Sequence, residues 1–384
     1  MKKIMFVATD ANLSGASLCL ISLVKDFRNK GYNTLVIIPK NGDIEIELKK
    51  YDINYLVVKS YPWVVLKEKS FFKKQKIAIK FFVKYFLNLF AIRKLKKIIK
   101  KEKINVVHIN SLFSYVGAIA AKKCKIKLVW HIREILEYGH QAKFFNEKSS
   151  YSLINKSDFI ITISEYVNNY YSKFLDNSKM HIVYDGLDVD KYYNPTKEIF
   201  KEPIIKFLLA GTIQKSKGQE EFIKALSLLK KSNYKNFKAT LIGYSTSKSK
   251  TNLLKLIEEL DLVNEVEYLG FKENVCDYWN ETDIAFMCST GEAFGRTTIE
   301  AKLSGCLIIG AAAGGTKELI FDKKDGLLYE VNSPEDLMEK IKFALDNIKL
   351  SRKIAKDGQT KAKKEFNSDL TTKKVIELYN KYFR

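Results

Sequence analysis

The residues that decide the fold are Ser289 to Ala301, STGEAFGRTTIEA. A strand-like apolar segment, residues 283–287, comes directly before them, and helix-forming residues follow Gly295. The order is therefore strand, tight loop and helix, and the helix N-terminus opens toward the loop. Such an N-terminus presents free backbone N–H groups and a partial positive charge. The stretch therefore predicts a site for a phosphate group.

Two glutamates, Glu292 on the loop and Glu300 in the helix, stand eight positions apart. Both can reach a ligand held at the helix N-terminus, and carboxylate oxygens accept hydrogen bonds from sugar hydroxyls. The competing interpretation is an exposed helix with ordinary glutamates, since Glu is common on protein surfaces. A ligand with hydroxyls on both sides of a diphosphate, such as a nucleotide-sugar, suits the first interpretation.

The residues that follow weaken the interpretation as a plain surface helix. Residues 305–310, GCLIIG, read as a buried strand, and residues 314–319, GGTKEL, read as a second glycine loop that begins another helix. Two adjacent units of strand, glycine loop and helix are what a doubly wound sheet uses to hold a ligand in one crevice.

The run 289–320 resembles the signature of retaining glycosyltransferase family 4, in which seven residues separate two glutamates and Gly-Gly-Thr-x-Glu follows. The resemblance implies the GT-B fold, an α/β fold in which two Rossmann-like domains face each other across a cleft. It also implies that Glu292 holds hydroxyls of the donor sugar, assisted by the backbone of Phe294 and Gly295. Glu300 would then hold the ribose of the nucleotide.

Composition sets the outer limits of the interpretation. At 384 residues, 46% of them apolar, the chain is typical of globular proteins and long for one core, so two domains are expected. The net charge of +22 predicts attraction to nucleic acid, an acidic membrane surface or a phosphorylated substrate. Five scattered cysteines without metal-ligand spacing read as reduced thiols of a cytoplasmic protein. The apolar start is too short for a signal peptide, and no run of about 18 apolar residues predicts a spanning helix.

Strand-like and helix-like segments alternate along both halves of the chain, which favours parallel sheets. Residues 1–185 are predicted to form an N-terminal, acceptor-binding Rossmann-like domain. A polar stretch that contains prolines, residues 186–203, reads as the linker. Residues 204–366 are predicted to form the nucleotide-sugar-binding domain, and the final helix, residues 367–384, is expected to cross back to the first domain, as in the GT-B proteins that the chain resembles.

Two segments of the first domain resemble motifs of the family. Gly15 lies in a loop of small residues after the first strand, near which the family places the donor diphosphate, and an ordinary βα loop is an equal alternative. His131 ends a strand, where ligand sites collect in open α/β sheets. A lone histidine is more often structural, but the resemblance implies that His131 approaches the transferred sugar. Arg133 and Glu134 are weaker candidates for contact with the acceptor or the donor sugar. The other histidines are expected to be structural or at the surface: His108, His140 and His181.

Residues 208–218, LLAGTIQKSKG, read as a strand, a glycine loop and a helix start in the second domain. Lys217 matches the family's Lys-Gly motif, whose lysine holds the departing diphosphate. The family often has Arg directly after the first glycine, here Gly211, and this chain has Thr212 instead. Either Lys215 substitutes for that Arg, or Lys217 and the helix N-termini suffice. The competing interpretation of both lysines is solvated charge in a lysine-rich chain.

Phe271 follows a glycine at the end of a predicted strand of the second domain. In the fold that the chain resembles, this region lines the nucleotide base, which makes Phe271 a candidate for donor binding. Filling the core is an equal alternative for a large aromatic side chain.

Asp188 and Asp190 match the Asp-x-Asp metal motif of the other major glycosyltransferase fold. They follow residues 184–187, YDGL, and the segment looks like the family's Asn-Gly-x-Asp linker with Asp185 in place of Asn. A hard metal ion requires clustered oxygen ligands. We therefore favour the linker interpretation and expect no essential metal and no cofactor, since the nucleotide-sugar is a substrate.

Residues 67–103 carry fourteen Lys or Arg, two Glu and many aromatic side chains on a predicted helix. Charge and aromatic residues together fit a helix that lies on anionic lipid. The alternative is a helix packed on the sheet with a lysine-rich outer face. Nucleic-acid binding is not expected, because no recognised module accompanies the stretch.

The resemblance implies a retaining hexosyltransferase with Glu292, His131 and Lys217 as catalytic residues, in which a phosphate oxygen takes the acceptor's proton and domain closure excludes water. The donor is expected to be a UDP-sugar. The acceptor is expected to be a lipid-linked or polysaccharide glycan in surface polysaccharide biosynthesis, such as a capsule, with the protein peripheral on the cytoplasmic face of the membrane. Two alternatives stay open: a nucleotide-sugar epimerase of GT-B fold, and a non-catalytic GT-B partner subunit of another transferase.

Overall fold

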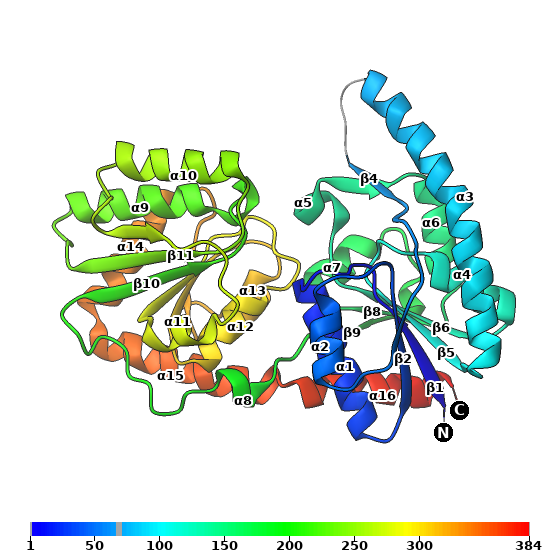
Figure 1. Cartoon of the computed structure of the whole chain (residues 1–384). Coiled ribbons are helices and arrows are strands. Elements are labelled where there is room, and N and C mark those ends of the chain that lie inside the picture. The colour runs from blue at the N-terminus through cyan, green and yellow to red at the C-terminus, as the bar shows by residue number, and fades with distance from the viewer. Residues whose placement is uncertain (1, 67–70, 384) are drawn as a thin grey trace. The chain divides into compact units, whose positions relative to one another are not determined.

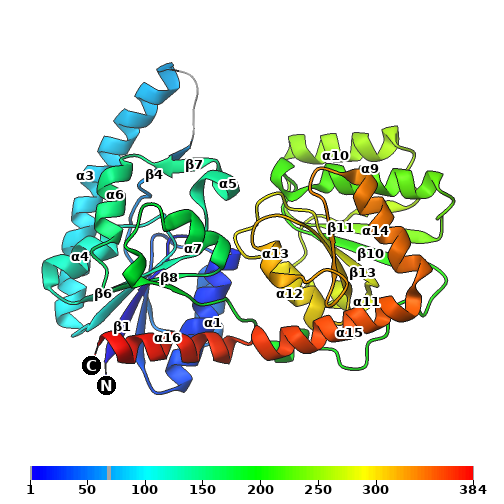
Figure 2. The ribbon, with the colours of Figure 1, turned by 180° about the vertical axis from the view of Figure 1, so that it is seen from behind.

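The computed structural model describes residues 2–66 and 71–383 and forms two compact units (Figure 1). The first unit comprises Met1–Gly186 together with Ser368–Arg384, and the second comprises Leu187–Asn367. Each unit contains its own parallel sheet with helices on both faces, as Figures 1 and 2 show. The fold is therefore the α/β, two-sheet architecture that the sequence predicts.

The first unit is built on a seven-stranded sheet in which every neighbouring pair of strands is parallel. Its strands, in spatial order, are β3 (Tyr55–Val57), β2 (Asn33–Ile38), β1 (Lys3–Val7), β5 (Val106–Asn110), β6 (Lys127–Ile132), β8 (Phe159–Thr162) and β9 (Met180–Ile182). Strands β5 and β8 are buried along their whole length, which explains why most of their residues are apolar.

The helices of the first unit follow its strands in the βα order of a doubly wound sheet. They are α1 (Gly15–Asn29), α2 (Ile44–Lys50), α3 (Phe71–Lys101), α4 (Val116–Cys124), α5 (Leu136–His140), α6 (Glu147–Ile154), α7 (Glu165–Tyr171) and α16 (Ser368–Tyr382). Side chains alternate along a strand, so Ile4 and Phe6 pack in one cluster with Phe27 of α1 and Tyr379 of α16. The opposite face is covered by α4, where a Cβ on Gly117 would lie 2.8 Å from Val7.

Helix α3 is attached to the first unit through its middle and its second half. Asn88 donates to Tyr61 O (2.9 Å) and to Tyr115 Oη (3.1 Å), and the residues beyond it include buried Ile92 and Leu95. The first turns of α3 extend beyond the sheet, next to an antiparallel pair of strands, β4 (Val64–Leu66) and β7 (Ala142–Phe144) (Figures 1 and 2). Residues 67–70 of the predicted basic helix lie outside the described residues.

The second unit contains a six-stranded sheet, again parallel throughout. Its strands, in spatial order, are β12 (Val266–Tyr268), β11 (Phe237–Ile242), β10 (Ile205–Ala210), β13 (Ile284–Met287), β14 (Leu307–Ala311) and β15 (Leu327–Tyr329). Its helices are α8 (Val189–Tyr192), the 3₁₀ helix η2 (Lys215–Lys217), α9 (Gln219–Lys231), α10 (Ser247–Glu259), α11 (Cys276–Glu281), α12 (Arg296–Leu303), α13 (Thr316–Leu319), α14 (Pro334–Asp346) and α15 (Ile348–Glu365).

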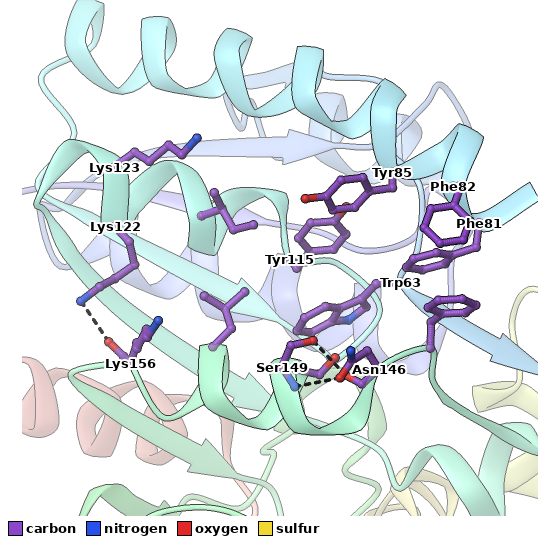
Figure 3. Close-up of a pocket in the computed structure, with 14 residues that line it drawn as sticks. Trp63, Phe81, Phe82, Tyr85, Tyr115, Lys122, Lys123, Asn146, Ser149 and Lys156 are labelled. Carbon is purple, nitrogen blue, oxygen red and sulfur yellow. Dashed lines mark hydrogen bonds between the residues drawn. The ribbon is translucent and has the colours of Figure 1, made fainter. Parts of the chain in front are cut away.

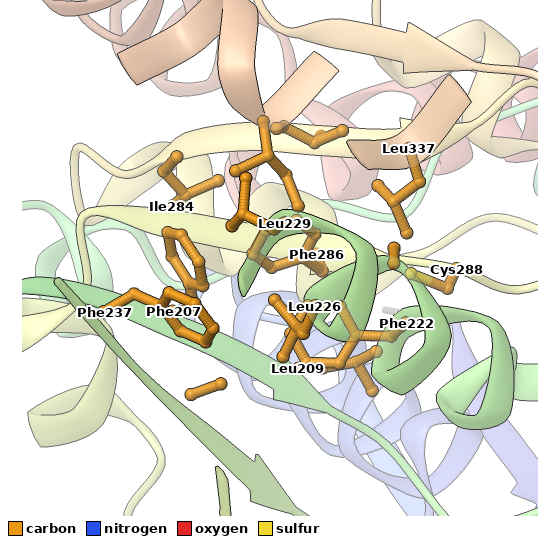
Figure 4. Close-up of a cluster of buried hydrophobic side chains, with 14 of the residues drawn as sticks. Phe207, Leu209, Phe222, Leu226, Leu229, Phe237, Ile284, Phe286, Cys288 and Leu337 are labelled. Atoms are coloured by element: carbon orange, nitrogen blue, oxygen red, sulfur yellow. The ribbon is translucent and has the colours of Figure 1, made fainter. Parts of the chain in front are cut away.

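The hydrophobic core of the second unit extends to the loops at the carboxyl end of its sheet. Phe207, Phe222 and Phe286 are almost fully buried, and the Phe222 and Phe286 rings lie 4.6 Å apart, so α9 packs against β10 and β13 (Figure 4). Cys288 belongs to the same cluster, one residue beyond the end of β13. The core therefore reaches the first residue of the loop that carries Glu292.

The segment predicted as a linker, residues 186–203, is mostly part of the second unit. Ile199 and Phe200 belong to the core of that unit, and Asp283 accepts a hydrogen bond from Phe200 N (2.6 Å). Helix α16 belongs to the first unit, where Thr372 donates to Asp26 of α1 (3.0 Å). The polar composition of 186–203 concealed two apolar anchors, since one or two buried side chains suffice to attach a short segment.

Candidate functional site

Lys217 and Glu292, which the sequence predicts as catalytic, are in contact in the second unit. Lys217 ends η2, in the loop after β10, and Glu292 lies in the loop between β13 and α12. Lys217 Nζ and Glu292 Oε2 are 2.5 Å apart in an ion pair, with 28% and 20% of the two side chains exposed. The pair is therefore ordered by contact and remains within reach of solvent.

The two loops meet because backbone groups join them. Ser216 O accepts hydrogen bonds from Thr290 N (3.0 Å) and Ser289 Oγ (3.1 Å). Gly218 has a φ of +71°, and a Cβ there would lie 2.1 Å from Cys288 O. Only glycine allows this approach. The glycine of the Lys-Gly motif thus brings Lys217 against the end of β13.

The second glycine loop supports the first from the other side. Gly315 N donates to Glu292 O (2.8 Å). Gly314 has a φ of +53°, and a Cβ there would lie 2.6 Å from the same carbonyl oxygen. The two glycine loops that follow β13 and β14 are therefore in direct contact, and they determine the position of the Glu292 backbone.

The electrostatic surroundings keep Glu292 ionised. Burial by itself would raise the pKa of its carboxyl, but the charge of Lys217 and hydrogen bonds from Lys217 and Ser289 outweigh burial and hold the pKa below its usual value. An ionised carboxylate only accepts hydrogen bonds, whereas an ammonium only donates them. The pair therefore offers an acceptor suited to hydroxyls beside a cation suited to phosphate.

Helix α12 begins directly after Gly295 and carries Glu300 on its second turn. Arg296 Nη2 lies 3.6 Å from Glu300 Oε1, and these side chains are 19% and 11% exposed. Burial raises the pKa of Tyr192, and the charge of Glu300 raises it further. Glu300 is thus accompanied by an arginine and a tyrosine that sequence reasoning missed; the i, i+4 spacing from Arg296 was the available signal, and Tyr192 gave none.

A buried charged pair holds α12 against the following loop. Lys302 Nζ donates to Asp325 Oδ1 (2.8 Å) and to Leu319 O (2.6 Å), and Lys361 Nζ lies 2.8 Å from Asp325 Oδ2. Burial lowers the pKa of Lys302 to about 8, although Asp325 opposes that shift. The interaction was not predicted, because a lysine on a helix normally reads as exposed.

Glycines followed by exposed aromatic residues lie just after β11 and β12. Gly243 N donates to Gly270 O (2.9 Å), which joins the loops after β11 and β12. Phe271 is 69% exposed and Tyr244 is 64% exposed. The structure therefore excludes the core-filling interpretation of Phe271 and adds Tyr244, which sequence analysis did not single out.

Two further predicted donor-binding residues lie in the loop after β10, where Gly211 is half-buried and Lys215 is exposed. Gly211 lies at the end of β10, where a Cβ would meet nothing within 4 Å. Lys215 begins η2, and Glu220 on α9 has a lowered pKa to which Lys224 contributes most and Lys215 least. In the first unit, Gly15 is the exposed first residue of α1, where Ser14 caps the helix by accepting from Ser17 N. Their donor-binding roles stay predictions.

His131, in the first unit, lies at the end of β6 and is completely buried. Its Nδ1 is 3.3 Å from Arg133 Nη2 and 3.2 Å from His108 Nε2, and His108 Nδ1 is 2.8 Å from Tyr379 Oη. The guanidinium only donates, so Nδ1 of His131 is an acceptor, His108 donates through Nε2, and Tyr379 donates to His108. His131 then carries its proton on Nε2, a buried atom without a hydrogen-bond partner within the described part of the chain.

Burial also decides the charge of these histidines. Burial, then the charge of Arg133, lowers the pKa of His108 to about 3, and the same causes hold the pKa of His131 well below its usual range. Both rings are therefore neutral at physiological pH. His131 can donate a hydrogen bond from Nε2, which suits a hydroxyl oxygen, but it is poorly suited to accept a proton.

The neighbours of His131 are engaged in structural contacts. Arg133 pairs with Asp185 and donates to Asn110 Oδ1 (2.6 Å), whereas Glu134 accepts from Ser111 Oγ (2.6 Å). These bonds show that both side chains hold the surrounding loops, and their predicted contacts with the acceptor or the donor sugar stay predictions. His108 is structural, as expected, and His181 Nε2 lies 2.8 Å from Tyr382 Oη. The side chain of His140 lies outside the described residues.

Two absences concern residues 2–66 and 71–383, one of a metal site and one of a membrane-spanning helix. Asp188 lies directly before α8, as its N-cap. Within those residues, no cluster of three or more His, Cys, Asp or Glu side chains could hold a metal ion. None of the helices described there combines the length and apolar character needed to cross a bilayer.

Comparisons with known proteins show the family and the fold of the chain. Residues 13–191 match the family described as Glycosyltransferase Family 4, and residues 194–361 match Glycosyl transferases group 1. The uncharacterized glycosyltransferase MJ1178 of Methanocaldococcus jannaschii is 28% identical over 77% of this chain and 78% of that protein. The N,N'-diacetylbacillosaminyl-diphospho-undecaprenol alpha-1,3-N-acetylgalactosaminyltransferase of Campylobacter jejuni is 23% identical over 65% of this chain and 62% of that protein.

The same fold is found in solved structures. Anabaena Alr3699/HepE, whose crystal structure contains UDP and glucose, superimposes with a TM-score of 0.82 at 22% identity, covering 99% of this chain and 100% of that one. TarM superimposes with a TM-score of 0.78 at 14% identity, covering 99% of each chain. With two parallel-sheet units and family matches that run from residue 13 to residue 361, the chain belongs to glycosyltransferase family 4 and is a glycosyltransferase of the GT-B fold.

Proposed function

We propose that this glycosyltransferase moves a hexosyl unit from a UDP-sugar to a lipid-linked or membrane-associated glycan, with retention at the anomeric carbon and without a metal, in surface polysaccharide biosynthesis. The observation that carries the proposal is the Lys217–Glu292 pair, held at the meeting of two glycine loops beside the start of α12. The Lys217 cation suits the phosphate side of a sugar–diphosphate bond. The Glu292 carboxylate, which accepts hydrogen bonds from hydroxyls, suits the sugar side.

In the proposed reaction the bond between the anomeric carbon and the diphosphate oxygen breaks. Lys217 and the N–H groups at the start of α12 stabilise the charge that develops on that oxygen. Glu292 accepts hydrogen bonds from sugar hydroxyls, and Glu300 from ribose hydroxyls. The acceptor hydroxyl bonds to the same face of the anomeric carbon, and its proton passes to a phosphate oxygen.

The histidine cluster of the first unit has a separate task in this proposal. The N–H of His131 Nε2, buried and without a partner within the described residues, donates to a hydroxyl of the transferred sugar. A neutral donor binds a hydroxyl without taking its proton. We therefore assign His131 to sugar binding and assign no proton transfer to it.

The acceptor part of the proposal draws on two supports. The Campylobacter relative is named for transfer to a sugar on diphospho-undecaprenol, a lipid-linked acceptor. Helix α3 of this chain exposes Phe82, Phe86 and Phe90 on a lysine-rich helix, which is the composition of helices that lie on anionic membranes. A peripheral position on the cytoplasmic face of the membrane follows from this part of the proposal.

The test is UDP release from a panel of UDP-sugars, UDP-glucose first, with and without bacterial membrane extract and with EDTA throughout. We expect one donor to be consumed only when extract is present, and we expect Glu292→Ala to abolish the release. Glu258→Ala, at an exposed glutamate of α10, is the matched control and should retain wild-type release. The anomeric configuration of the isolated product, read by NMR coupling constants, tests retention.

Each other outcome removes a stated part of the proposal. Release without any acceptor, with free UDP and an altered sugar, would indicate an epimerase. Release that stops in EDTA and returns with Mg²⁺ would contradict metal independence. No release from UDP-sugars or GDP-sugars would indicate a non-catalytic partner of another transferase.

A further inference from the structure

The first unit contains a cavity between α3, α4 and α6, lined by none of the residues of the histidine cluster (Figure 3). Its volume is about 720 Å³, within the range of about 300–1,000 Å³ that is typical of sites for small molecules. Its aromatic wall is formed by Trp63, Phe81, Phe82, Tyr85 and Tyr115. The wall therefore offers a large apolar surface to an occupant.

The aromatic end of this pocket is firmly built. The Trp63 ring stacks on Tyr115 at 5.0 Å, and Trp63 Nε1 donates to Leu112 O. Phe81 of α3 stacks on Phe145 with ring centroids 3.8 Å apart and an interplanar angle of 11°. These contacts connect α3 to the body of the unit, so the apolar wall does not depend on an occupant for its shape.

The opposite end of the pocket is basic. Lys122 and Lys123 at the end of α4 and Lys156 after α6 line it, and all three are exposed. Figure 3 shows these lysines on the side of the pocket away from Trp63 and Phe81. None of the described residues that line the pocket is acidic. An occupant with an apolar chain and an anionic end would match both parts.

The helix that forms one wall also exposes apolar side chains beyond the pocket. On α3, Phe86 is 61% exposed and Phe90 is 64% exposed, next to exposed Phe82 of the pocket wall. A large apolar surface rimmed by cations is the signature of a helix in the interface of an anionic bilayer. The pocket therefore opens beside a surface that would itself lie in the lipid.

We propose that this pocket binds a hydrocarbon chain of an anionic bilayer phospholipid, with the phosphate of that lipid at Lys122, Lys123 and Lys156. The proposal rests on the proposed function only in that the acceptor is membrane-associated. It assigns α3 to the bilayer interface and the pocket to one lipid of that bilayer. The hydrocarbon chain of the lipid packs beside Trp63, and the three lysines select the anionic headgroup.

The full chain is tested on vesicles of phosphatidylcholine with phosphatidylglycerol, in which one lipid at a time carries brominated acyl chains. Bromine quenches tryptophan fluorescence only at short range, and the chain has three tryptophans. We expect brominated phosphatidylglycerol to quench wild-type fluorescence more than brominated phosphatidylcholine at equal bound protein. Trp63→Phe should lose most of this difference. Equal quenching by the two brominated lipids would overturn the assignment of the headgroup.

A variant that fills the pocket separates binding of the protein to the vesicle surface from entry of a lipid hydrocarbon chain into the pocket. Ser149 is exposed at the pocket edge on α6, and Ser149→Tyr should lose the brominated-lipid quenching while it still floats with the vesicles. Quenching that is unchanged in Ser149→Tyr would overturn the proposal. So would failure of the wild-type chain to bind anionic vesicles, and so would quenching seen only with a free long-chain prenyl phosphate.

A charge variant tests the basic end. Replacing Lys122, Lys123 and Lys156 with Gln should weaken partitioning onto anionic vesicles by about fivefold per lysine, the equivalent of about 1 kcal/mol each. The matched control replaces three exposed lysines of the second unit: Lys231, Lys235 and Lys248. A control variant that loses as much binding would show that net charge, not the pocket, attracts the lipid, and would overturn the proposal.

The readouts for the two proposals are independent. UDP release in the presence of a detergent-solubilised acceptor depends on Glu292 and should survive in Ser149→Tyr. Lost quenching with retained UDP release would therefore overturn the lipid pocket alone. Retained quenching without UDP release would overturn the proposed function alone.

Discussion

The histidine cluster of the first unit and the lysine–glutamate pair of the second occupy the same kind of position, near the carboxyl end of strands in a parallel sheet. Their electrostatics are opposite. His131 is completely buried beside Arg133 and stays neutral, whereas Lys217 and Glu292 are partly exposed and form an ion pair. The first cluster offers a hydrogen-bond donor, and the second offers charges.

The difference shows that the sign of a neighbouring charge decides what burial does. At His131, burial and the Arg133 cation act in the same direction, because both disfavour protonation and lower the pKa. At Glu292, burial and the Lys217 cation oppose each other, and the cation wins. The same sheet geometry thus holds a neutral hydrogen-bond donor in one unit and a charged pair in the other.

The largest expected effect concerns the Lys217–Glu292 pair. Lys217→Met removes the cation next to Glu292, and we expect UDP release to fall by about 10²–10³-fold, because one preorganised stabilising group contributes about that much. Lys215→Met tests whether Lys215 substitutes for the absent Arg, and release within about threefold of wild type would assign the cation to Lys217 alone. Equal losses in both variants would mean that charge is spread over the loop instead of residing in one pair.

The histidine cluster is tested at Tyr379, the residue that lies farthest from His131 along the chain. Tyr379→Phe leaves Nδ1 of His108 as a buried acceptor without its donor, which should cost about 1–3 kcal/mol of unfolding free energy, measured with urea. In this variant the proton of His131 should no longer reside only on Nε2. The nitrogen-15 shifts of His131 report that change, which a loss of packing alone would not cause. Tyr382→Phe, at the partly exposed partner of His181, should cost less. Unchanged nitrogen-15 shifts of His131 would contradict the series of hydrogen bonds from Tyr379 through His108 to His131.

A smaller effect is expected at the aromatic end of the second unit. Phe271→Ala should weaken UDP binding, measured by calorimetry, by about 1–3 kcal/mol, which is typical for loss of an aromatic ring stacked on a base. Leu254→Ala, at another exposed apolar side chain of this unit, should leave the binding unchanged. If Tyr244→Ala weakens binding and Phe271→Ala does not, the base stacks on the tyrosine instead.

The most gradual effect is the pH dependence of stability. His108 and His131 have folded pKa values below the unfolded value of about 6.5, so the unfolded chain binds more protons below that pH and acidification destabilises the first unit. The loss should approach about 1.4 kcal/mol per pH unit for each histidine between pH 6 and pH 5. The Glu292 contribution, present above about pH 4.3, is lost only at lower pH, because its folded pKa is depressed.

Hydrogen exchange of the β5 and β6 peptides between pH 7 and pH 5, corrected for intrinsic exchange rates, measures this slope in the first unit alone. His108→Gln, which retains a donor and an acceptor, should have a smaller slope than wild type. An identical slope would show that His108 does not stay neutral in the fold.

Short-range features were readable from the sequence because their causes are local. The strand, glycine loop and helix at residues 283–303 depend on neighbouring residues, and the structure places β13, the Glu292 loop and α12 there. The Lys-Gly and Gly-Gly pairs were recognisable as close backbone approaches. Which carbonyl each glycine approaches was not, because Cys288 O and Glu292 O are distant in the chain from Gly218 and Gly314.

By itself, the sequence determined the α/β architecture, the family and the identity of the groups that could hold a nucleotide-sugar. Only the tertiary structure decided their state. Lys217 meets Glu292 across 75 residues, and His108 meets Tyr379 across 271. Protonation, tautomer and exposure depend on what surrounds a side chain in space, so the neutrality of His131 and the exposure of Phe271 follow from the folded chain alone.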